Sequence, residues 1–345
     1  MSQLEVISNH VITNDTFANA HEFNAEGMRQ YDHLIIGEYD AKRMFIAGLA
    51  LGRGNVLLAG IPGGGKSTLL EGAHLIIDGI EANDIASIPH RTDLTPAQLI
   101  GDSTKAVKET TGADGQVLRE EISAIIHAIL TPDKKKVEID EITRGNPFVL
   151  NAILGILAKR SAVINGVRTD FSNIELVASA LNPKESLSSS FRAGAALASR
   201  QTLGAQLGNN TQVQNLAISG DIWSNNWVSA PEKVEKVIDL AGLHAIRASI
   251  PKVIVGKSLL PQAASASVRT MEALAESDTP IDEAIGRISE DIRDITKTLA
   301  LLDGEPRATE KNLYDAVEYR VTGALTMRGG DATDVKNTMN AIYKG

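Results

Sequence analysis

Short apolar runs and longer amphipathic stretches alternate over the first half of the chain. Four runs are rich in aliphatic and β-branched residues and are bounded by polar or turn-forming residues, which is typical of buried strands. These runs are Asn55–Ala59, Ile85–Pro89, Lys136–Glu141 and Ile174–Ala180. Apolar residues recur at helical spacing around them, which predicts helices over Glu38–Arg53, Thr68–Ile77, Glu120–Leu130 and Pro147–Arg160. Strands that alternate with helices predict an α/β fold with a parallel sheet between helical layers.

The pattern changes after residue 183. Residues 184–228 are irregular and rich in Ser, Gly, Asn and Gln, and Trp223 and Trp227 near their end are candidates to anchor a linker against a core. Helical spacing returns over Pro231–Ala248, Leu260–Ala275, Asp282–Leu302 and Thr309–Thr326. We therefore predict an N-terminal arm over 1–30, ordered or loose, an α/β domain over 31–203, a linker over 204–228 and an all-helical lid domain over 229–345.

Two further segments carry turn signals. Asn165-Gly166 lies between short β-branched runs and predicts a hairpin over 161–170. Residues 102–115 are polar and contain glycine, so they predict an exposed loop or a short hairpin.

The first strand leads directly into the glycine-rich sequence Gly60-Ile61-Pro62-Gly63-Gly64-Gly65-Lys66-Ser67, which fits G-x-x-x-x-G-K-[ST], the phosphate-binding P-loop. A strand before it and a helix from Thr68 after it give the context that separates a P-loop from a chance glycine-rich turn. In this motif backbone N–H groups and the helix N-terminus surround phosphate oxygens. We expect Gly60, Pro62, Gly63, Gly64, Gly65, Lys66, Ser67 and Thr68 to bind nucleotide, with Lys66 on the β/γ-phosphates and the Ser67 hydroxyl on Mg²⁺.

The strand Lys136–Glu141 ends in Asp140-Glu141, which is the pattern of the second ATPase motif, Walker B. Asp140 would hold Mg²⁺, and Glu141 would orient and deprotonate the attacking water. An apolar strand that ends in two acids is a weak signal alone, but downstream of a P-loop it is strong. Glu138 departs from the all-apolar strand, which suggests that it lies at a strand edge or faces an interface.

Asn182 and Pro183 end the last predicted strand of the α/β region. A polar residue at the carboxyl end of a buried parallel strand lies where such sheets bind ligands. The same Asn could instead cap a turn before the proline, and the strand pattern alone favours that interpretation.

Composition narrows the function classes. The 345 residues are 43% apolar, 22% charged and 4% aromatic, which fits a globular protein with an aliphatic core. The net charge of −9 and the lack of a basic stripe argue against nucleic acid as the main partner. No cysteine is present and the seven histidines are scattered, so disulfides and a zinc site are not expected. With neither a signal-peptide pattern nor a membrane-length apolar run, we expect a cytoplasmic protein.

Several segments resemble the MoxR family of AAA+ ATPases, in the family's order and over roughly residues 34–325. Leu57–Ser67 is similar to its "LLxGxPGxGKT", and Asp140-Glu141-Ile142-Thr143-Arg144 to its "DEINR". Ala178–Pro183 is similar to "IATQNP". The other similar segments are Arg91–Pro96 with Leu99–Gly101, Asn151–Leu154, Ile164–Val167, and Ala300–Gly304 with Ala308–Thr309. The linker region is poorly matched.

The resemblance implies further roles. It places Asn182 at sensor 1, which contacts the γ-phosphate, and Arg287 at sensor 2 on a lid helix, with Arg269 as the alternative. It implies an arginine finger supplied to a neighbouring subunit, for which Arg200 fits best and Arg192 competes. Arg144 could also face a subunit interface. The implied cofactors are ATP and Mg²⁺, and the implied assembly is a homo-oligomeric ring, a hexamer.

The resulting hypothesis is an AAA+ ATPase that remodels or matures client proteins, with a von Willebrand factor A domain protein as a possible partner and residues 102–115 facing the client or the pore. One alternative is a ring ATPase that acts on nucleic acid or with a nuclease. A small-molecule kinase would need neither Asn182 and Arg287 nor a helical lid. A nucleotide-gated scaffold with weak hydrolysis is disfavoured by Glu141.

Overall fold

The computed structural model describes residues 14–89, 93–111, 117–126, 128–142, 147–164, 167–182, 195–208, 212–224, 226–277, 281 and 283–344. Its centre is a five-stranded sheet in the order β10-β1-β9-β6-β3, in which every neighbouring pair is parallel. The strands are β1 (Asn55–Ala59), β3 (Ile85–Pro89), β6 (Lys136–Asp140), β9 (Leu176–Leu181) and β10 (Leu203–Gln206). The predicted parallel sheet is therefore confirmed.

Helices cover both faces of this sheet because successive strand residues point to opposite sides and both sides are apolar. Leu57 and Ala59 face one core, and Val56 and Leu58 face the other. The first core is closed by α4 (Pro96–Ile100), α5 (Pro147–Lys159), α7 (Ala195–Ala198), α10 (Leu259–Ala275) and α13 (Ala332–Lys344). The second is closed by α1 (Asn14–Tyr31), α2 (Tyr39–Leu51), α3 (Lys66–Gly72) and α9 (Leu240–Ser249). The helices α11 (Ile285–Leu302) and α12 (Glu310–Met327) contribute to both.

Three of the C-terminal helices, α10, α11 and α12, lie close to where the sequence pattern places them. The helix expected over Pro231–Ala248 needs correction, because α9 begins only at Leu240, after one 3-10 turn at Pro231–Lys233 and a short strand at Ile238–Asp239. The last helix, α13, was not expected.

Thr309 caps α12 by accepting a hydrogen bond from the Asn312 N–H at 3.2 Å. The lid lies directly on the sheet, because α12 packs along β10 where Gly204 faces Gly323. A methyl group built on Gly204 would lie 2.2 Å from the Gly323 nitrogen, so glycine is required for this close approach.

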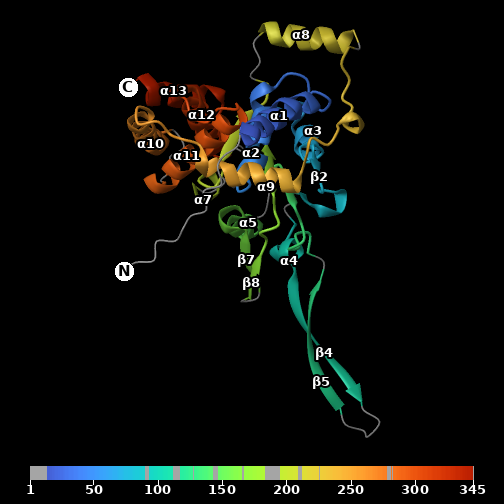
Figure 1. Ribbon diagram of the computed structural model, residues 1–345. Coiled ribbons are helices and arrows are strands. Elements are labelled where there is room, and N and C mark those ends of the chain that lie inside the picture. Colours follow the sequence, from blue (N-terminus) through green and yellow to red (C-terminus); the bar gives the residue numbers. More distant parts are fainter. Residues whose placement is uncertain are drawn as a thin grey trace.

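Three short two-stranded ladders lie outside the main sheet. The pairs are β2 (Ile77–Asp78) with β11 (Ile238–Asp239), β7 (Ser161–Ile164) with β8 (Val167–Asp170), and β4 (Asp102–Thr111) with β5 (Val117–Ile126). The β7–β8 pair confirms the predicted hairpin, although its Asn165-Gly166 turn lies outside the described residues. The β4–β5 hairpin projects far from the body of the molecule (Figure 1).

Two predictions about this hairpin need correction. The helix expected over Glu120–Leu130 is wrong, because residues 117–126 form β5. Of the loop or short hairpin expected over 102–115, residues 102–111 form one side of a ladder of ten residue pairs, and the rest lies outside the described residues. The apolar residues of 120–130 fit helical spacing, but the pairing with β4 overrides that local preference. The ladder places Lys108 opposite Glu120 and Glu109 opposite Arg119, so opposite charges share cross-strand positions.

The structure also revises the ends of the predicted domains. Residues 203–206 form β10, an edge strand of the sheet, and α8 (Gln212–Trp223) lies within the expected linker. In Figure 1, α8 stands off the body on the side opposite the hairpin. The Trp227 ring N–H donates to the Asp32 carbonyl at 2.7 Å, whereas Trp223 is 87% exposed and does not serve as an anchor. From Asn14 on, the N-terminal arm is ordered as α1, which packs on α2 and α11.

Candidate active site

The P-loop connects β1 to α3 at the carboxyl edge of the sheet. Gly63 and Gly65 have φ values of 79° and 83°, which glycine adopts without strain, and the Gly64 N–H donates to the Ile61 carbonyl at 3.2 Å. Gly65 is the N-cap of α3, so the free N–H groups of the first helical turn face the loop. This arrangement fits phosphate oxygens held by backbone N–H groups.

Lys66 is 8% exposed and turns back over the loop. Its ammonium donates to the Gly60 carbonyl at 2.8 Å and to the Ile61 carbonyl at 2.9 Å. The positive charge is therefore already held at the mouth of the P-loop, beside the position where phosphates would bind.

Ser67 and Asp140 meet across the edge of the sheet. The Ser67 hydroxyl donates to Asp140 Oδ2 at 3.1 Å, and Asp140 is the last residue of β6. The Ser67 hydroxyl and the Asp140 carboxylate therefore lie close enough to bind one ion. Oxygen atoms of these two kinds are the ligands that Mg²⁺ prefers. The residues present therefore fit Mg²⁺ bound with a nucleotide, as expected from the sequence.

Glu141 follows Asp140 with a left-handed backbone, φ 51°, and its N–H donates to Asp140 Oδ1 at 3.0 Å. This conformation is strained for a residue other than glycine, and such strain is concentrated at active sites.

Asn182 lies directly after β9, which runs between β1 and β6. It is 7% exposed, and the residue before it, Leu181, pairs with Ala59 and accepts a hydrogen bond from the Gly60 N–H at 3.3 Å. The register thus brings Asn182 beside the P-loop, at the end of a strand that lies between β1, which leads into the P-loop, and β6, which ends in Asp140. Lys66, Ser67, Asp140, Glu141 and Asn182 share one edge of the sheet, as the sequence predicts.

Glu138 does not lie at a strand edge or an interface, contrary to the sequence prediction. It is 6% exposed on β6, an interior strand, and accepts from the buried Lys136 ammonium at 2.5 Å and from the Ser87 hydroxyl at 2.9 Å. Lys136 also donates to the Leu70 carbonyl at 2.7 Å near the end of α3. The pair therefore links the strand of Asp140 to the P-loop helix.

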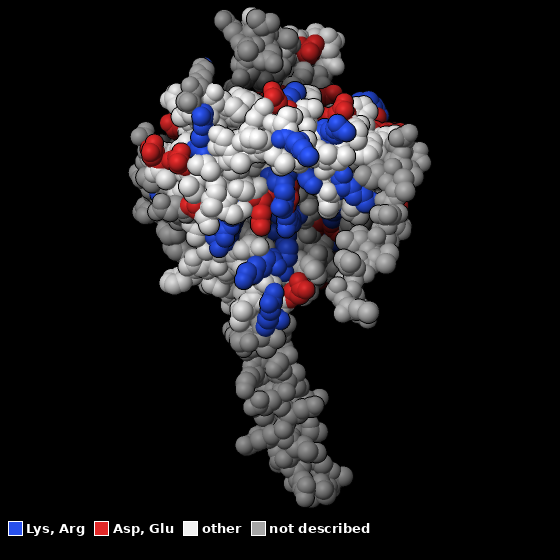
Figure 2. Space-filling model, turned by 60° about the vertical axis from the view of Figure 1, so that its left-hand side comes forward, with Lys and Arg blue, Asp and Glu red and all other residues white. Residues whose placement is uncertain are grey.

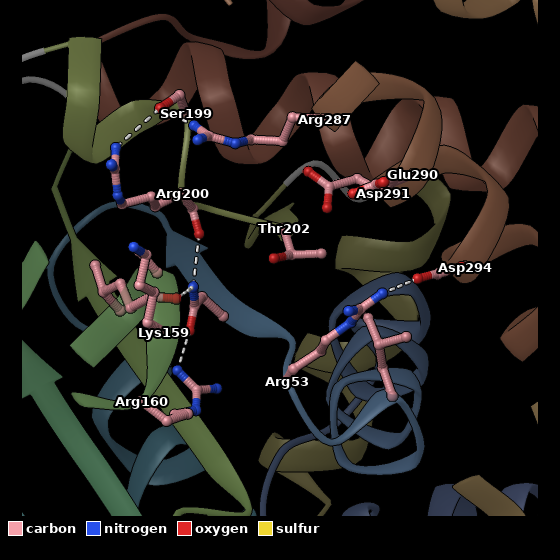
Figure 3. Close-up of a pocket in the computed structure, with 14 residues that line it drawn as sticks. Arg53, Lys159, Arg160, Ser199, Arg200, Thr202, Arg287, Glu290, Asp291 and Asp294 are labelled. Carbon is pink, nitrogen blue, oxygen red and sulfur yellow. Dashed lines mark hydrogen bonds and ion pairs between the residues drawn. The ribbon is translucent and has the colours of Figure 1, made fainter. Parts of the chain in front are cut away.

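Arg200 and Arg287 lie at the opposite end of β1. The Arg200 carbonyl accepts from the side chain of Asn55, the first residue of β1, at 2.7 Å. Both arginines line a cavity of about 360 Å³ whose walls also carry Arg53, Lys159 and Arg160, with Glu290, Asp291 and Asp294 on one side (Figure 3). On the face turned forward in Figure 2, Lys and Arg side chains form a band that runs down the molecule.

The two alternative assignments fare differently. Arg269 lies on α10 and donates to the Ile342 carbonyl of α13 at 2.9 Å, so it ties two lid helices together away from both ends of β1. Arg192 and Arg144 lie outside the described residues, and their expected roles stay predictions.

Comparison with known proteins agrees with this geometry. Residues 55–200 match the family model of the AAA domain (dynein-related subfamily). The fold is similar to that of a crystal structure described as a "putative ATPase" from Cytophaga hutchinsonii ATCC 33406, at 18% identity and a TM-score of 0.63, over 88% of this chain and 87% of that one. No curated protein matches the sequence.

The chain has the AAA+ fold. Its core is the parallel sheet with flanking helices, and its C-terminal region is the helical lid, as the sequence predicts. Among the helices that the structure describes, none combines the length and the apolar character needed to cross a membrane.

Sequence analysis missed part of the AAA+ lid that surrounds Arg287. Arg320 of α12 is fully buried and pairs with Glu283, and it also donates to Asp291 at 3.0 Å. Burial raises the pKa of the Glu283 carboxyl, and the Arg320 charge opposes that rise. The available signal was that Arg320 falls at helical spacing with Leu313, Val317 and Ala324, on the face that α12 buries, and charged residues are rarely fully buried unless paired.

Proposed function

We propose that this chain is a MoxR-type ATPase that hydrolyses ATP at sites shared between neighbouring copies of a hexameric ring and uses the cycle to remodel client proteins. The observation that carries the proposal is the separation of the site into two halves. The P-loop, Asp140, Glu141 and Asn182 lie at the carboxyl end of β1 and its neighbours, whereas Arg200 and Arg287 lie at the amino end. β1 alone spans roughly 13 Å.

The carboxyl edge has the parts for hydrolysis. The P-loop N–H groups and Lys66 hold the phosphates, and Ser67 and Asp140 hold the metal ion, which neutralises developing charge when bound. Glu141 accepts a proton from water as the water oxygen attacks the terminal phosphorus and the phosphoanhydride bond breaks. Asn182 orients that water. The negative charge that develops on the terminal phosphate in the transition state also needs a cation on the side opposite Lys66.

Arg200 and Arg287 are cations suited to stabilise that negative charge. Within one chain, however, they lie at the opposite end of β1 from the P-loop. A second copy that presents its basic cavity to this P-loop would complete the site. An arginine supplied in this way contributes roughly 10³–10⁵-fold to the hydrolysis rate in nucleotide hydrolases. The shared site also explains why two arginines lie together beside acids but far from their own nucleotide.

A subunit-mixing experiment tests the shared site. Lys66→Ala removes the P-loop cation but leaves both arginines, and the double variant Arg200→Ala/Arg287→Ala does the reverse. We expect each protein alone to hydrolyse ATP roughly 10³-fold more slowly than wild type and their mixture to regain activity. The matched control mixes Lys66→Ala with Glu141→Gln, which damage the same half. An inactive first mixture, or a fully active double arginine variant, would refute the proposal.

The β4–β5 hairpin supports the client-remodelling part of the proposal. A two-stranded hairpin is marginal in water by itself, and β4 and β5 form their ladder only with each other. Its projection from the body in Figure 1 suits contact with a client or with a partner such as a von Willebrand factor A domain. Replacing residues 102–126 by a short linker should leave basal ATPase activity intact and abolish client or partner binding in pull-down assays.

The basic band in Figure 2 favours one second candidate, a ring ATPase that acts on nucleic acid. That function predicts ATPase stimulation by single- or double-stranded DNA or RNA that weakens steeply as salt rises. The net charge of −9 opposes it. Stimulation by nucleic acid that is lost in Lys159→Ala would establish the second candidate over the first.

A further inference from the structure

Arg200 and Arg287 are held by the same hydroxyl group. Arg287 Nη1 donates to Ser199 Oγ at 3.1 Å, and Arg200 Nη1 donates to it at 3.3 Å. The hydroxyl donates in turn to the Ala196 carbonyl at 3.2 Å, which also accepts from Arg200 at 2.5 Å. Figure 3 shows the two guanidinium groups converging on Ser199 from the short helix α7 side and from α11. Ser199 is 5% exposed, so water does not readily replace it.

A buried ion pair lies behind this arrangement. The side chains of Arg320 and Glu283 are 0% and 1% exposed, and Arg320 also donates to the Ser199 carbonyl at 3.5 Å. The remaining Glu283 oxygen, Oε1, lies 3.8 Å from Arg287 Nη1. Arg320 therefore contacts the backbone of Ser199 and orients Glu283, and Glu283 and Ser199 both contact Arg287.

Two like charges at one hydroxyl are unfavourable unless an anion joins them. Burial and the neighbouring Arg287 charge both lower the pKa of Arg200. Arg200 Nε and Arg320 Nη1 are buried and make no hydrogen bond to the residues that the structure describes. Glu283, which lies 3.8 Å from Arg287, is shared with the buried Arg320, whereas Arg43 has Asp303 at 2.9 Å and Asp315 at 2.6 Å. The geometry instead prepares both cations for one polyanionic group.

We propose that Ser199, Glu283 and Arg320 are positioning residues that hold Arg200 and Arg287 as a single two-arginine unit for the phosphates of a neighbouring copy's nucleotide. The inference rests on the proposed function and deepens it, because it assigns a role to three residues outside the two arginines. It predicts that damage to the positioning residues affects the subunit that supplies the arginines, and not the P-loop of the same chain.

The first test measures kcat and KM for ATP in Ser199→Ala and Ser199→Thr. Loss of a hydrogen bond to charged groups corresponds to roughly 10-fold or more in rate. We expect Ser199→Ala to lower kcat about 10-fold with KM changed less than about 2-fold, and Ser199→Thr, which retains the hydroxyl, to regain most of the loss. Arg293→Ala, on the same helix as Arg287 and exposed, is the matched control and should keep its activity. An unchanged kcat in Ser199→Ala would overturn the proposal.

Because Arg320→Met alone leaves Glu283 and Asp291 without their partner and endangers folding, the second variant is Arg320→Met/Glu283→Leu/Asp291→Asn, which removes all three charges together. We expect its thermal stability to lie close to wild type while its kcat stays about 10-fold low. If stability and kcat both return to wild type, the ion pair has a packing role only and the proposal fails.

Mixing separates a positioning role from general damage. In an equal mixture with Lys66→Ala subunits, about half of the P-loops of the Ser199→Ala subunits receive intact arginines, so the rate per intact P-loop should rise about 5-fold toward wild type. Ser199→Ala mixed with Arg200→Ala/Arg287→Ala should gain far less. Equal behaviour of the two mixtures would overturn the positioning role. If instead the arginine variants alone keep full activity, the proposed function itself fails, and the two failures are distinguishable.

Discussion

Two buried cations in this chain lie beside carboxylates and close to groups of the candidate active site. Lys136 pairs with Glu138 behind the P-loop helix, and Arg320 pairs with Glu283 behind Arg287. Replacing a whole buried ion pair with apolar residues is often neutral for stability, so stability alone does not explain such pairs. A positioning role explains them better, because the Lys136–Glu138 pair holds the P-loop helix and the Arg320–Glu283 pair holds Arg287.

Glu141 offers the simplest test at this scale. Glu141→Gln keeps the size of the side chain and removes the base, so we expect nucleotide binding to persist while hydrolysis falls roughly 10²–10⁴-fold. Binding would be followed with a fluorescent ATP analogue, and phosphate release would give the rate. Glu305→Gln, an exposed change near the end of α11, is the control. Retention of more than a tenth of the wild-type rate would remove Glu141 from its assigned role.

His74 makes the folding stability of the chain depend on pH. Burial first, and then the Lys136 ammonium 3.2 Å from its Nδ1, lower the pKa of His74 to about 4. An unfolded histidine binds a proton near pH 6.5, so between pH 6.5 and 4 the unfolded chain binds more protons, and stability falls as pH falls. The contribution is complete above pH 6.5, and about 2 kcal/mol of it is lost by pH 5.

Urea unfolding of wild type and His74→Gln at pH 7 and pH 5 measures this contribution. The wild type should lose about 2 kcal/mol more than the variant between the two pH values. Carboxylates that also titrate in this range contribute equally to both proteins and cancel in the difference. Equal losses in the two proteins would show that His74 is not held neutral by its surroundings.

At the scale of elements, the sequence pattern predicted the strands whose signal lies within one continuous stretch. It missed the strands that form only because they pair with another segment. β1 and β9 follow apolar runs that are buried on both faces, and β3 and β6 each carry a buried apolar face, so the signal lies within each sequence. β10 is only four residues long with a glycine inside, and only its pairing with β1 makes it a strand. The β4–β5 ladder is a stronger case, since β5 fits helical spacing until β4 lies beside it.

The same distinction applies to the site. The P-loop and Asp140-Glu141 are contiguous motifs and were predictable, and Asn182 was placed by the end of a predicted strand. Ser199, Glu283 and Arg320 come from three separate elements that meet only when α7, α11 and α12 pack. No single stretch contains their relation, so sequence alone could name Arg287 but not the residues that hold it.

The contact of β10 with α12 predicts a sharp contrast between two glycines. Gly204→Ala forces a methyl group to within 2.2 Å of the Gly323 backbone, and overpacking of this kind costs about 1–3 kcal/mol. Gly220 of α8 has nothing within 4 Å of the added carbon, and Ala is favoured over Gly there by up to about 1 kcal/mol. Thermal unfolding should show a lower midpoint for Gly204→Ala and an unchanged or higher one for Gly220→Ala. Equal midpoints would mean that the lid does not lie against β10.

For the whole molecule, the question is how copies with a net charge of −9 come together. Like net charge opposes association. A nucleotide bound at the P-loop of one copy could offset this repulsion by placing its phosphates against Arg200 and Arg287 of the next copy. Mg·ATP should therefore raise the particle mass toward that of a hexamer, and Glu141→Gln, which binds without hydrolysis, should keep it there. Higher salt should weaken the assembly because the contacts that bring the faces together are electrostatic.

Light scattering of wild type, Glu141→Gln and Glu141→Gln/Arg200→Ala/Arg287→Ala, each with and without Mg·ATP, measures this assembly. If the arginines contact a neighbour's phosphates, the triple variant should bind nucleotide as tightly per subunit in the dilute, dissociated state but assemble less at equal concentration. Assembly that is equally strong in the triple variant would mean that other contacts build the ring and that the arginines act only on the rate. A particle that stays at one subunit mass while it binds ATP would contradict the shared site, because the two halves of the site would then never meet.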